Sequence, residues 1–318
     1  MIVEPARVVG VVVPPGDRPG SATAGRPTAV AALVVAVSIW GGSFVVVKSG
    51  VRSEPLFHYL ALRFFLSALV LAPLALRSGE LRAALAHPGP WALGGLLFAA
   101  LVLQTAGLRT TSPAHSAFVT SLSVLVVPFL VWASARRPPP RRSWLAALGA
   151  TAGLALIFSG SAGHWQAGDV PSLGCAFAFA LYIVLAGRVT PGVPVVGAMA
   201  VQSVACLGLS LPWLALETRT PLVPSPHSGV FWSAVYAGVL ATALCYGLQL
   251  YAQRRLDSIQ TAILLSLEPA IATATSLLLG DDTLTLTLVL GGALLLAAAI
   301  SVDTLAPPRA RRPQNDCL

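Results

Sequence analysis

Two ionisable side chains lie inside long apolar stretches of this sequence. Glu268 stands directly before Pro269 in LLSLEPAIATATSLL, and Arg63 lies in FHYLALRFFLSALVLAPLAL. A carboxylate in apolar surroundings can exchange a proton or hold a cation, and a guanidinium can hold an anion. Pro269 has no amide hydrogen and clashes with the carbonyl of Leu265, so a helix here is expected to kink. The acid and the freed carbonyl would both be satisfied in the wall of a watery cavity.

The composition is that of a membrane protein. Of 318 residues, 56% are hydrophobic and 10% are charged, whereas an ordinary soluble domain carries about 25% charged residues. So few charged residues cannot cover a soluble core of this size. The net charge of +8 does not indicate a nucleic-acid partner, because the basic residues flank apolar stretches and form no basic stripe.

Ten stretches are long enough to cross a bilayer as helices, which takes about 20 residues. Eight contain no charge and are at least 18 residues long: 27–47, 83–108, 110–135, 143–168, 170–187, 189–216, 220–253 and 283–302. Two more, 55–76 and 258–280, carry one charge each, Arg63 and Glu268. The predicted fold class is an all-α integral membrane protein with ten transmembrane helices.

The arginines predict the orientation, since basic loops stay on the cytoplasmic side. With the N-terminus inside, fifteen basic residues are cytoplasmic, and the opposite face receives four: Lys48, Arg52, Arg109 and Arg219. Both termini are therefore predicted to be cytoplasmic. Residues 1–27 are expected to be a disordered leader, because their apolar run is too short for a signal peptide, and residues 305–318 a cytoplasmic tail.

An internal repeat divides the apolar part of the chain. Shifting residues 96–124 by 145 positions aligns Gln104 with Gln249, and Arg109 with Arg254. A shift of 139 places Arg63 opposite Gln202. We interpret residues 28–160 and 161–304 as two five-helix repeats, and because five is odd, the second crosses the membrane in the inverted sense. Inverted repeats are typical of carriers whose binding site lies near the midplane.

Several stretches resemble the EamA-like permeases of the drug/metabolite transporter superfamily, over roughly residues 30–303. The resemblance implies a ten-helix carrier of small metabolites in the inner membrane, often an exporter. One departure concerns a Gly-Glu pair that the family usually has after the fourth span and again after the ninth. Here the first site reads WASARRPPP, and the second reads Gly280, Asp281, Asp282. The stretches that carry the resemblance are AVSIWGGSFVVVKSGV, FHYLALRFFLSALVLAPLAL, TSPAHSAFVTSLSVLVVPFL, GDVPSLGCAFAFALYIVLAGR and LLSLEPAIATATSLLLGDDTLTLTLVLGGALLLAAAI.

Glu268 and Arg63 are the first candidates for a substrate and coupling site. Glu268 is expected to line the cavity, with two alternatives: a structural ion pair with Arg63, or a solvated helix end. Arg63 could anchor an anionic group of the substrate or brace its own helix. The further pathway candidates are polar or aromatic residues within spans: Gln202, Gln104, Gln249, Trp40 and Tyr182. The candidates for helix kinks are two prolines, Pro269 and Pro128.

The remaining residues do not indicate an enzyme. The four cysteines and five histidines are scattered, so neither a metal site nor another cofactor is predicted. No GxxxxGK[ST] loop is present, which argues against nucleotide hydrolysis. A secondary transporter for a small molecule in the cell membrane is therefore expected, with proton coupling as one energy source and a homodimer as one assembly. A channel or a structural membrane protein is the alternative.

Overall fold

The computed structural model describes residues 25–159, 166–217, 225, 227–279 and 285–304. This part of the chain consists of helices and their connections and contains no β-strand. The all-helical class is therefore confirmed for the described residues. Most of the predicted leader, the predicted tail and the Gly280-Asp281-Asp282 corner lie outside them.

Seven helical stretches are long and apolar enough to cross a membrane. They lie in α2 (Arg26–Ser53), α3 (Leu56–Arg77), α5 (Pro88–Thr110), α6 with α7 (Pro113–Ser121, Ser123–Ala135), α9 (Asp169–Val189), α10 (Val195–Leu214), and the run of α11, η3 and α12 (Gly229–Val235, Tyr236–Leu244, Cys245–Gln253).

Three further helical segments lie at the places of the remaining predicted spans. Each is too short or not apolar enough to count among the membrane-crossing stretches. They are α8 (Arg141–Phe158), α13 with α14 (Ser258–Leu265, Glu268–Leu279), and α15 (Leu286–Thr304). The count of ten crossings therefore stays a prediction. Two short elements, α4 (Glu80–Ala86) and η2 (Thr190–Gly192), connect longer helices.

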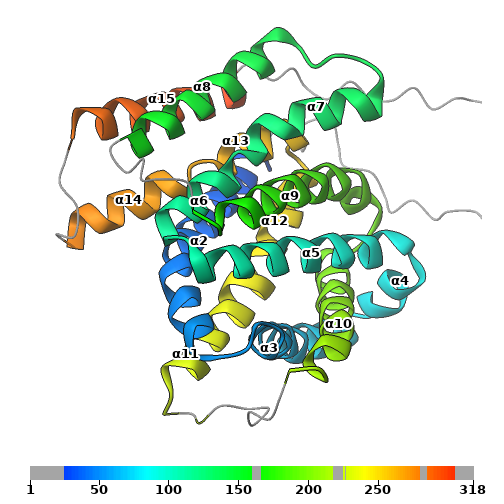
Figure 1. Ribbon diagram of the computed structural model, residues 1–318. Coiled ribbons are helices and arrows are strands. Elements are labelled where there is room, and N and C mark those ends of the chain that lie inside the picture. Colours follow the sequence, from blue (N-terminus) through cyan, green and yellow to red (C-terminus); the bar gives the residue numbers. More distant parts are fainter. Residues whose placement is uncertain (1–24, 160–165, 218–224, 226, 280–284, 305–318) are drawn as a thin grey trace, which may run out of the picture.

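The long helices pack mainly in four pairs: α8 with α15, α5 with α9, α3 with α10, and α2 with α12. Figure 1 shows the first pair along one side of the molecule and α3 with α10 along the opposite side. The other two pairs lie between them. Every pair joins one helix from before residue 160 with one from after it, so the two halves of the chain are interleaved.

Three of the helical segments are irregular. α6 ends at Ser121 and α7 begins at Ser123, while α13 ends at Leu265 and α14 begins at Glu268. The 145-residue shift aligns residues 121–123 with residues 266–268, so both breaks fall at the same place in the repeat. The third irregularity is η3, a π-helix of nine residues. π-Helical turns are rare and are frequent at functional sites.

Matched arginines hold the starts of α3 and α10. Arg109 Nη2 donates to the carbonyl of Glu54, just before α3, at 2.6 Å. Arg254 Nη2 donates to the carbonyl of Val193, just before α10, also at 2.6 Å. The 145-residue shift pairs the arginines and the 139-residue shift pairs the acceptors, so the same contact occurs once in each half.

Glutamates cap the same two helices. His58 N in the first turn of α3 donates to Glu217 Oε2 at 2.9 Å, and Glu217 follows the end of α10. Gly197 N in the first turn of α10 donates to Glu80 Oε2 at 3.0 Å, and Glu80 follows the end of α3. Each helix therefore begins where the other ends, so α3 and α10 are antiparallel, as an inverted repeat predicts.

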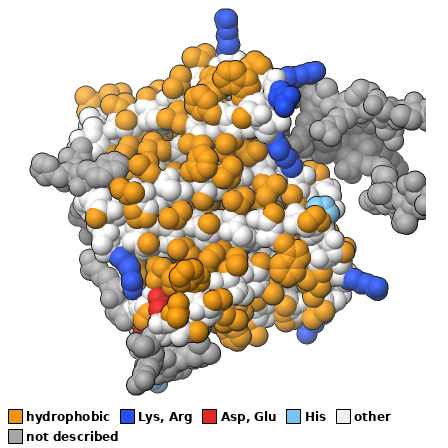
Figure 2. Space-filling view, turned by 45° about the vertical axis from the view of Figure 1, so that its right-hand side comes forward, with side chains coloured by type: hydrophobic (Ala, Val, Ile, Leu, Met, Phe, Trp, Pro, Cys, Tyr) orange, Lys and Arg blue, Asp and Glu red, His pale blue; other side chains and the backbone are white. Residues whose placement is uncertain are grey.

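The outer surface suits a lipid environment. Large apolar side chains such as Phe65, Leu69 and Trp232 are 46–62% exposed. Figure 2 shows apolar side chains across the middle of one face, with basic side chains around its margin. A continuous apolar surface of this extent is unusual on a soluble monomer and typical of a membrane-facing one.

Candidate functional site

A cavity lies between the two halves of the molecule. It leaves about 60 Å³ for the centres of water molecules, and one water needs about 10–15 Å³. Several waters therefore fit. Its walls come from α2, α3, α5, α6, α7, α9, α12, α13 and α14, and the lining residues are Trp40, Ser43, Phe44, Val47, Arg63, Gln104, Leu108, Thr120, Ser121, Ser123, Phe179, Ile183, Tyr246, Gln249, Leu265, Ser266 and Glu268.

Glu268 reaches this cavity because its helix is interrupted. α14 begins at Glu268, and Pro269 occupies the second position, where the missing amide hydrogen costs no helical bond. The predicted kink at Pro269 thus takes the form of a break between α13 and α14. Glu268 is partly exposed, and its carboxylate accepts no hydrogen bond and forms no ion pair among the described residues.

The backbone of Glu268 packs closely against α2. A Cβ atom added to Gly41 would lie 3.3 Å from the carbonyl oxygen of Glu268 and 3.3 Å from the amide nitrogen of Ala272. Both distances are tighter than ordinary van der Waals contact. The glycine therefore lets the first turn of α14 approach α2, which helps to position the carboxylate at the cavity.

Arg63 projects from α3 and is held at one nitrogen. It is 3% exposed, and its Nε donates to Thr242 Oγ1 in η3 at 2.8 Å. Thr242 Oγ1 in turn donates to the carbonyl of Ala237, five residues earlier. A Cβ atom added to Gly238 would lie 2.6 Å from the carbonyl of Arg63, so the π-helix lies directly on the backbone of α3. The terminal nitrogens of Arg63 have no hydrogen-bond partner within the described residues.

Arg63 and Glu268 line the same cavity without touching each other. Neither side chain takes part in an ion pair within the described part of the chain, where His58 pairs with Glu54 and His115 with Asp169. The alternative in which Glu268 neutralises Arg63 through a direct pair is therefore not formed in this conformation. Separate charges of opposite sign can hold the two ends of one molecule that carries both charges.

Gln104 and Gln249, which the repeat aligns, both line the cavity. Gln249 Nε2 donates to Gln253 Oε1 at 3.3 Å. Trp40 also lines the cavity; its ring lies edge-on to that of Tyr246 at 4.8 Å, and its Nε1 donates to the carbonyl of Ala241 at 2.8 Å. Trp40 therefore contributes both a wall and a link between α2 and η3.

Two predicted pathway residues do not line the cavity. Tyr182 is fully buried and donates through its hydroxyl to Gln202 Oε1 at 2.9 Å. Gln202 Nε2 is buried without a partner in the described part of the chain. Tyr182 contacts the cavity indirectly, since its ring lies 5.7 Å from that of Tyr246. Pro128 lies inside α7, and the break in that segment comes earlier, at Leu122.

Several lining residues were not singled out from the sequence, although the repeat carried a signal for some. The 145-residue shift aligns Ser121 with Ser266, and Ser123 with Glu268. All four line the cavity. No such signal marked Tyr246 in the sequence. It reaches the cavity because α12 continues directly from the π-helix η3. No cluster of metal-binding side chains occurs among the described residues.

Known proteins resemble this chain over most of its length. The sequence model of the EamA-like transporter family matches it twice, over residues 27–159 and 166–302. An uncharacterized transporter of Archaeoglobus fulgidus is 27% identical over 271 residues, which cover 85% of this chain and 84% of that protein. A protein of known crystal structure has the same fold: it is 22% identical, with a TM-score of 0.72, over 88% of this chain and 98% of the other.

The matches agree with the apolar helices and with the division of the chain into two halves. They point to a transporter and away from an enzyme. The chain belongs to the EamA-like transporter family and is a multi-pass membrane protein.

Proposed function

We propose that this protein is a secondary transporter that moves a small molecule by alternating access. Its ten helical segments form two inverted repeats, and the cavity between them opens to one side of the membrane and then to the other. The observation that carries the proposal is the cavity itself, since both halves line it at matched positions and it contains one acid and one base.

Glu268 and Arg63 divide the work of binding. Arg63 holds an anionic group of the substrate through the terminal nitrogens that Thr242 does not occupy. Glu268 holds a cationic group or a proton, so that release of one can be coupled to binding of the other. Gln104, Gln249 and Trp40 complete the wall. Tyr182 and Gln202 support this site from behind Tyr246.

The protein lies in the cell membrane, the inner membrane of a cell that has two, with both termini in the cytoplasm. The distribution of arginines supports this orientation. Export is the direction that the family resemblance favours. Because each protomer encloses its own cavity, a homodimer would add no residue to this site.

The substrate can be found by a thermal-shift screen of metabolites, since a ligand that binds the native state raises its melting temperature. Amino acids and other small molecules that carry both charges are the first set. A hit is then tested for counterflow in proteoliposomes, in which an internal load accelerates uptake. Carriers show this acceleration, and a channel does not.

Replacing Glu268 by Gln tests the coupling role. The amide keeps the shape and removes the charge, so proton-driven flux is expected to be lost. Exchange of substrate for substrate is expected to persist at a reduced rate, because an amide can still accept a hydrogen bond from the substrate. Replacing Arg63 by Ala is expected to weaken binding of anionic and zwitterionic compounds most. Unchanged proton-driven flux in Glu268→Gln, or equal loss for neutral compounds in Arg63→Ala, would contradict these roles.

A further inference from the structure

The two ends of the cavity are closed in different ways, although the repeat makes them equivalent. If inverted repeats exchange their conformations during transport, contacts present at both ends stay formed, and contacts at one end mark the present state. The contacts of Arg109 with Glu54 and of Arg254 with Val193 occur at both ends. They are therefore permanent attachments, and the gates must lie elsewhere.

At the end where α9 and α12 finish, the helices touch closely. Gln253 of α12 is fully buried, and its Nε2 donates to the carbonyl of Ile183 in α9 at 2.8 Å. Ser258 of α13 donates to the same carbonyl at 3.4 Å. A Cβ atom added to Gly187 would lie 2.6 Å from Ser258 Oγ. Polar contacts and a close approach thus seal this end, which the arginine pattern places on the cytoplasmic side.

The other end differs at one of two matched positions. Phe44 corresponds to Ile183, and both line the cavity; Leu108 corresponds to Gln253, and Leu108 lines the cavity whereas Gln253 does not. Phe44 and Leu108 are 5% and 1% exposed and lie in one apolar cluster. Lys48 corresponds to the closely packed Gly187. A long side chain therefore spans this end at the place where, at the sealed end, the helices are in contact.

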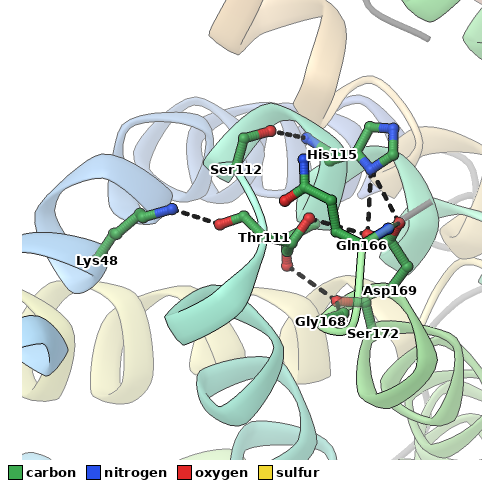
Figure 3. A network of polar contacts seen from close by, with 9 residues as sticks. Lys48, Thr111, Ser112, His115, Gln166, Gly168, Asp169 and Ser172 are labelled. Atoms are coloured by element: carbon green, nitrogen blue, oxygen red, sulfur yellow. Dashed lines mark hydrogen bonds and ion pairs between the residues drawn. The ribbon is translucent and has the colours of Figure 1, made fainter. Parts of the chain in front are cut away.

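Figure 3 shows Lys48 of α2 reaching toward Thr111. Its Nζ donates to the carbonyl of Thr111, between α5 and α6. The Thr111 hydroxyl donates to Asp169 Oδ1 at 2.9 Å, and His115 Nδ1 lies 3.1 Å from the same oxygen. Asp169 is fully buried and also accepts from Gln166 N at 2.8 Å. The lysine therefore rests on a loop that is fixed to the start of α9.

We propose that the cytoplasmic gate of this protein consists of Gln253, Ser258 and Gly187 closing on the Ile183 carbonyl, and that Lys48 on the Thr111 carbonyl is the outer gate. The structure then has its inner end joined by hydrogen bonds from Gln253 and Ser258. Its outer end is joined by the hydrogen bond of Lys48 and by the apolar packing of Phe44 and Leu108. This assignment rests on the topology of the proposed function. It names the residues that must separate when the cavity opens to the cytoplasm.

The test uses a variant in which the native cysteines are replaced and Ser43, in the cavity wall, is changed to Cys. A membrane-impermeant maleimide is applied to right-side-out and to inside-out vesicles. In the starting protein, labelling from outside is expected to be faster than from the cytoplasmic side. Faster labelling from the cytoplasmic side would overturn the assignment of the two ends.

Gly187→Ala is then added to hold the inner gate apart, because its new methyl group meets Ser258 Oγ. Labelling from the cytoplasmic side is expected to rise about tenfold, as for a shift between two states of similar free energy. The double variant Gly187→Ala, Ser258→Ala should restore slow labelling, since the Ser258 Cβ would lie 3.9 Å away. The shorter hydrogen bond of the gate, from Gln253 to the Ile183 carbonyl at 2.8 Å, remains in this variant. The matched control is Gly192→Ala, which has no atom within 4 Å of its added Cβ.

Lys48→Met tests the outer gate and is expected to speed labelling from outside, while Lys48→Arg keeps the bridge and the slower rate. An unchanged cytoplasmic rate in Gly187→Ala, or a double variant that labels as fast as the single one, would overturn the inner gate. Labelling needs no substrate. A protein that passes this test but shows no counterflow would contradict the proposed transport and leave the gates in place.

Discussion

Residues 121–123 and residues 266–268 interrupt their helices at matched positions of the repeat, and both segments line the cavity. Their last residues differ: the first half presents the hydroxyl of Ser123, and the second presents the carboxylate of Glu268. The interruption is therefore a property of the repeated backbone, whereas the charge belongs to one half. If a substrate binds between the two breaks, as we propose, it meets a neutral hydrogen-bonding group on one side and an acid on the other.

The helices α2 and α9, which occupy matched places in the two halves, also differ in the size of one residue. Gly41 of α2 faces the break that carries Glu268, and the 139-residue shift aligns it with Ala180 of α9. Ala180 is fully buried and already carries a Cβ atom. The second break can thus approach its neighbouring helix more closely than the first. Both the acid and the small residue that accommodates it are on one side of the cavity.

The largest effect is expected from making the two breaks alike. Glu268→Ser gives the second break the chemistry of the first and removes a charged partner of the substrate. Hydrogen bonds to charged groups contribute about 1.5–3 kcal/mol, so transport of a cationic or zwitterionic substrate is expected to fall roughly 10- to 100-fold. Uptake by reconstituted protein, with the substrate found in the thermal-shift screen, measures the loss.

The reciprocal double variant Ser123→Glu, Glu268→Ser moves the acid to the matched position. If position within the repeat determines access to the substrate, activity is expected to recover in part. If the single variant Glu268→Ser folds normally and transports as fast as the unmodified protein, the acid has no role in binding.

The sequence predicted the helices well because hydropathy records what each helix faces. Charge-free runs of apolar residues identified the regions of α2, α5, α9 and α10, and an apolar run with the single charge of Arg63 identified α3. The one acid and the one base within spans both line the cavity. An ionisable group in an apolar helix has few places to go except a cavity or a partner. The place of Glu268 and Arg63 in a cavity wall could therefore be predicted from the sequence, and their role in transport stays a prediction.

Irregular backbone was harder to predict. Pro269 gave a signal for the break before α14, but the matched break at Leu122 has no proline, and Pro128 lies within a continuous helix. The π-helix η3 also has no proline, and its form depends on packing against Arg63 through Gly238. Tyr182 and Gln202 contact each other and do not line the cavity. Within one span, a polar residue that faces a neighbouring helix has the same sequence pattern as one that faces water.

A smaller effect is expected from Gly41→Ala. Its added methyl group meets the backbone of Glu268 and of Ala272 at 3.3 Å, and overpacking of this kind costs about 1–3 kcal/mol. The melting temperature in detergent is expected to fall, and Glu268 is expected to move, so transport falls as well. Gly42→Ala is the matched control, because its added Cβ would meet only the hydroxyl of Tyr236, at 3.5 Å. Equal effects of the two variants would mean that the close approach of α14 is not needed.

The smallest effect is expected from Trp40→Phe, which makes α2 resemble α9, since the repeat aligns Trp40 with Phe179. The change removes the hydrogen bond from Nε1 to the carbonyl of Ala241, worth about 1 kcal/mol, and keeps an aromatic wall against Tyr246. Melting should fall slightly and transport should persist, whereas Trp40→Ala should cost about 3–5 kcal/mol. If Trp40→Phe abolished transport without lowering stability, the indole itself would contact the substrate, and the aromatic walls of the two halves would be as unequal as their breaks.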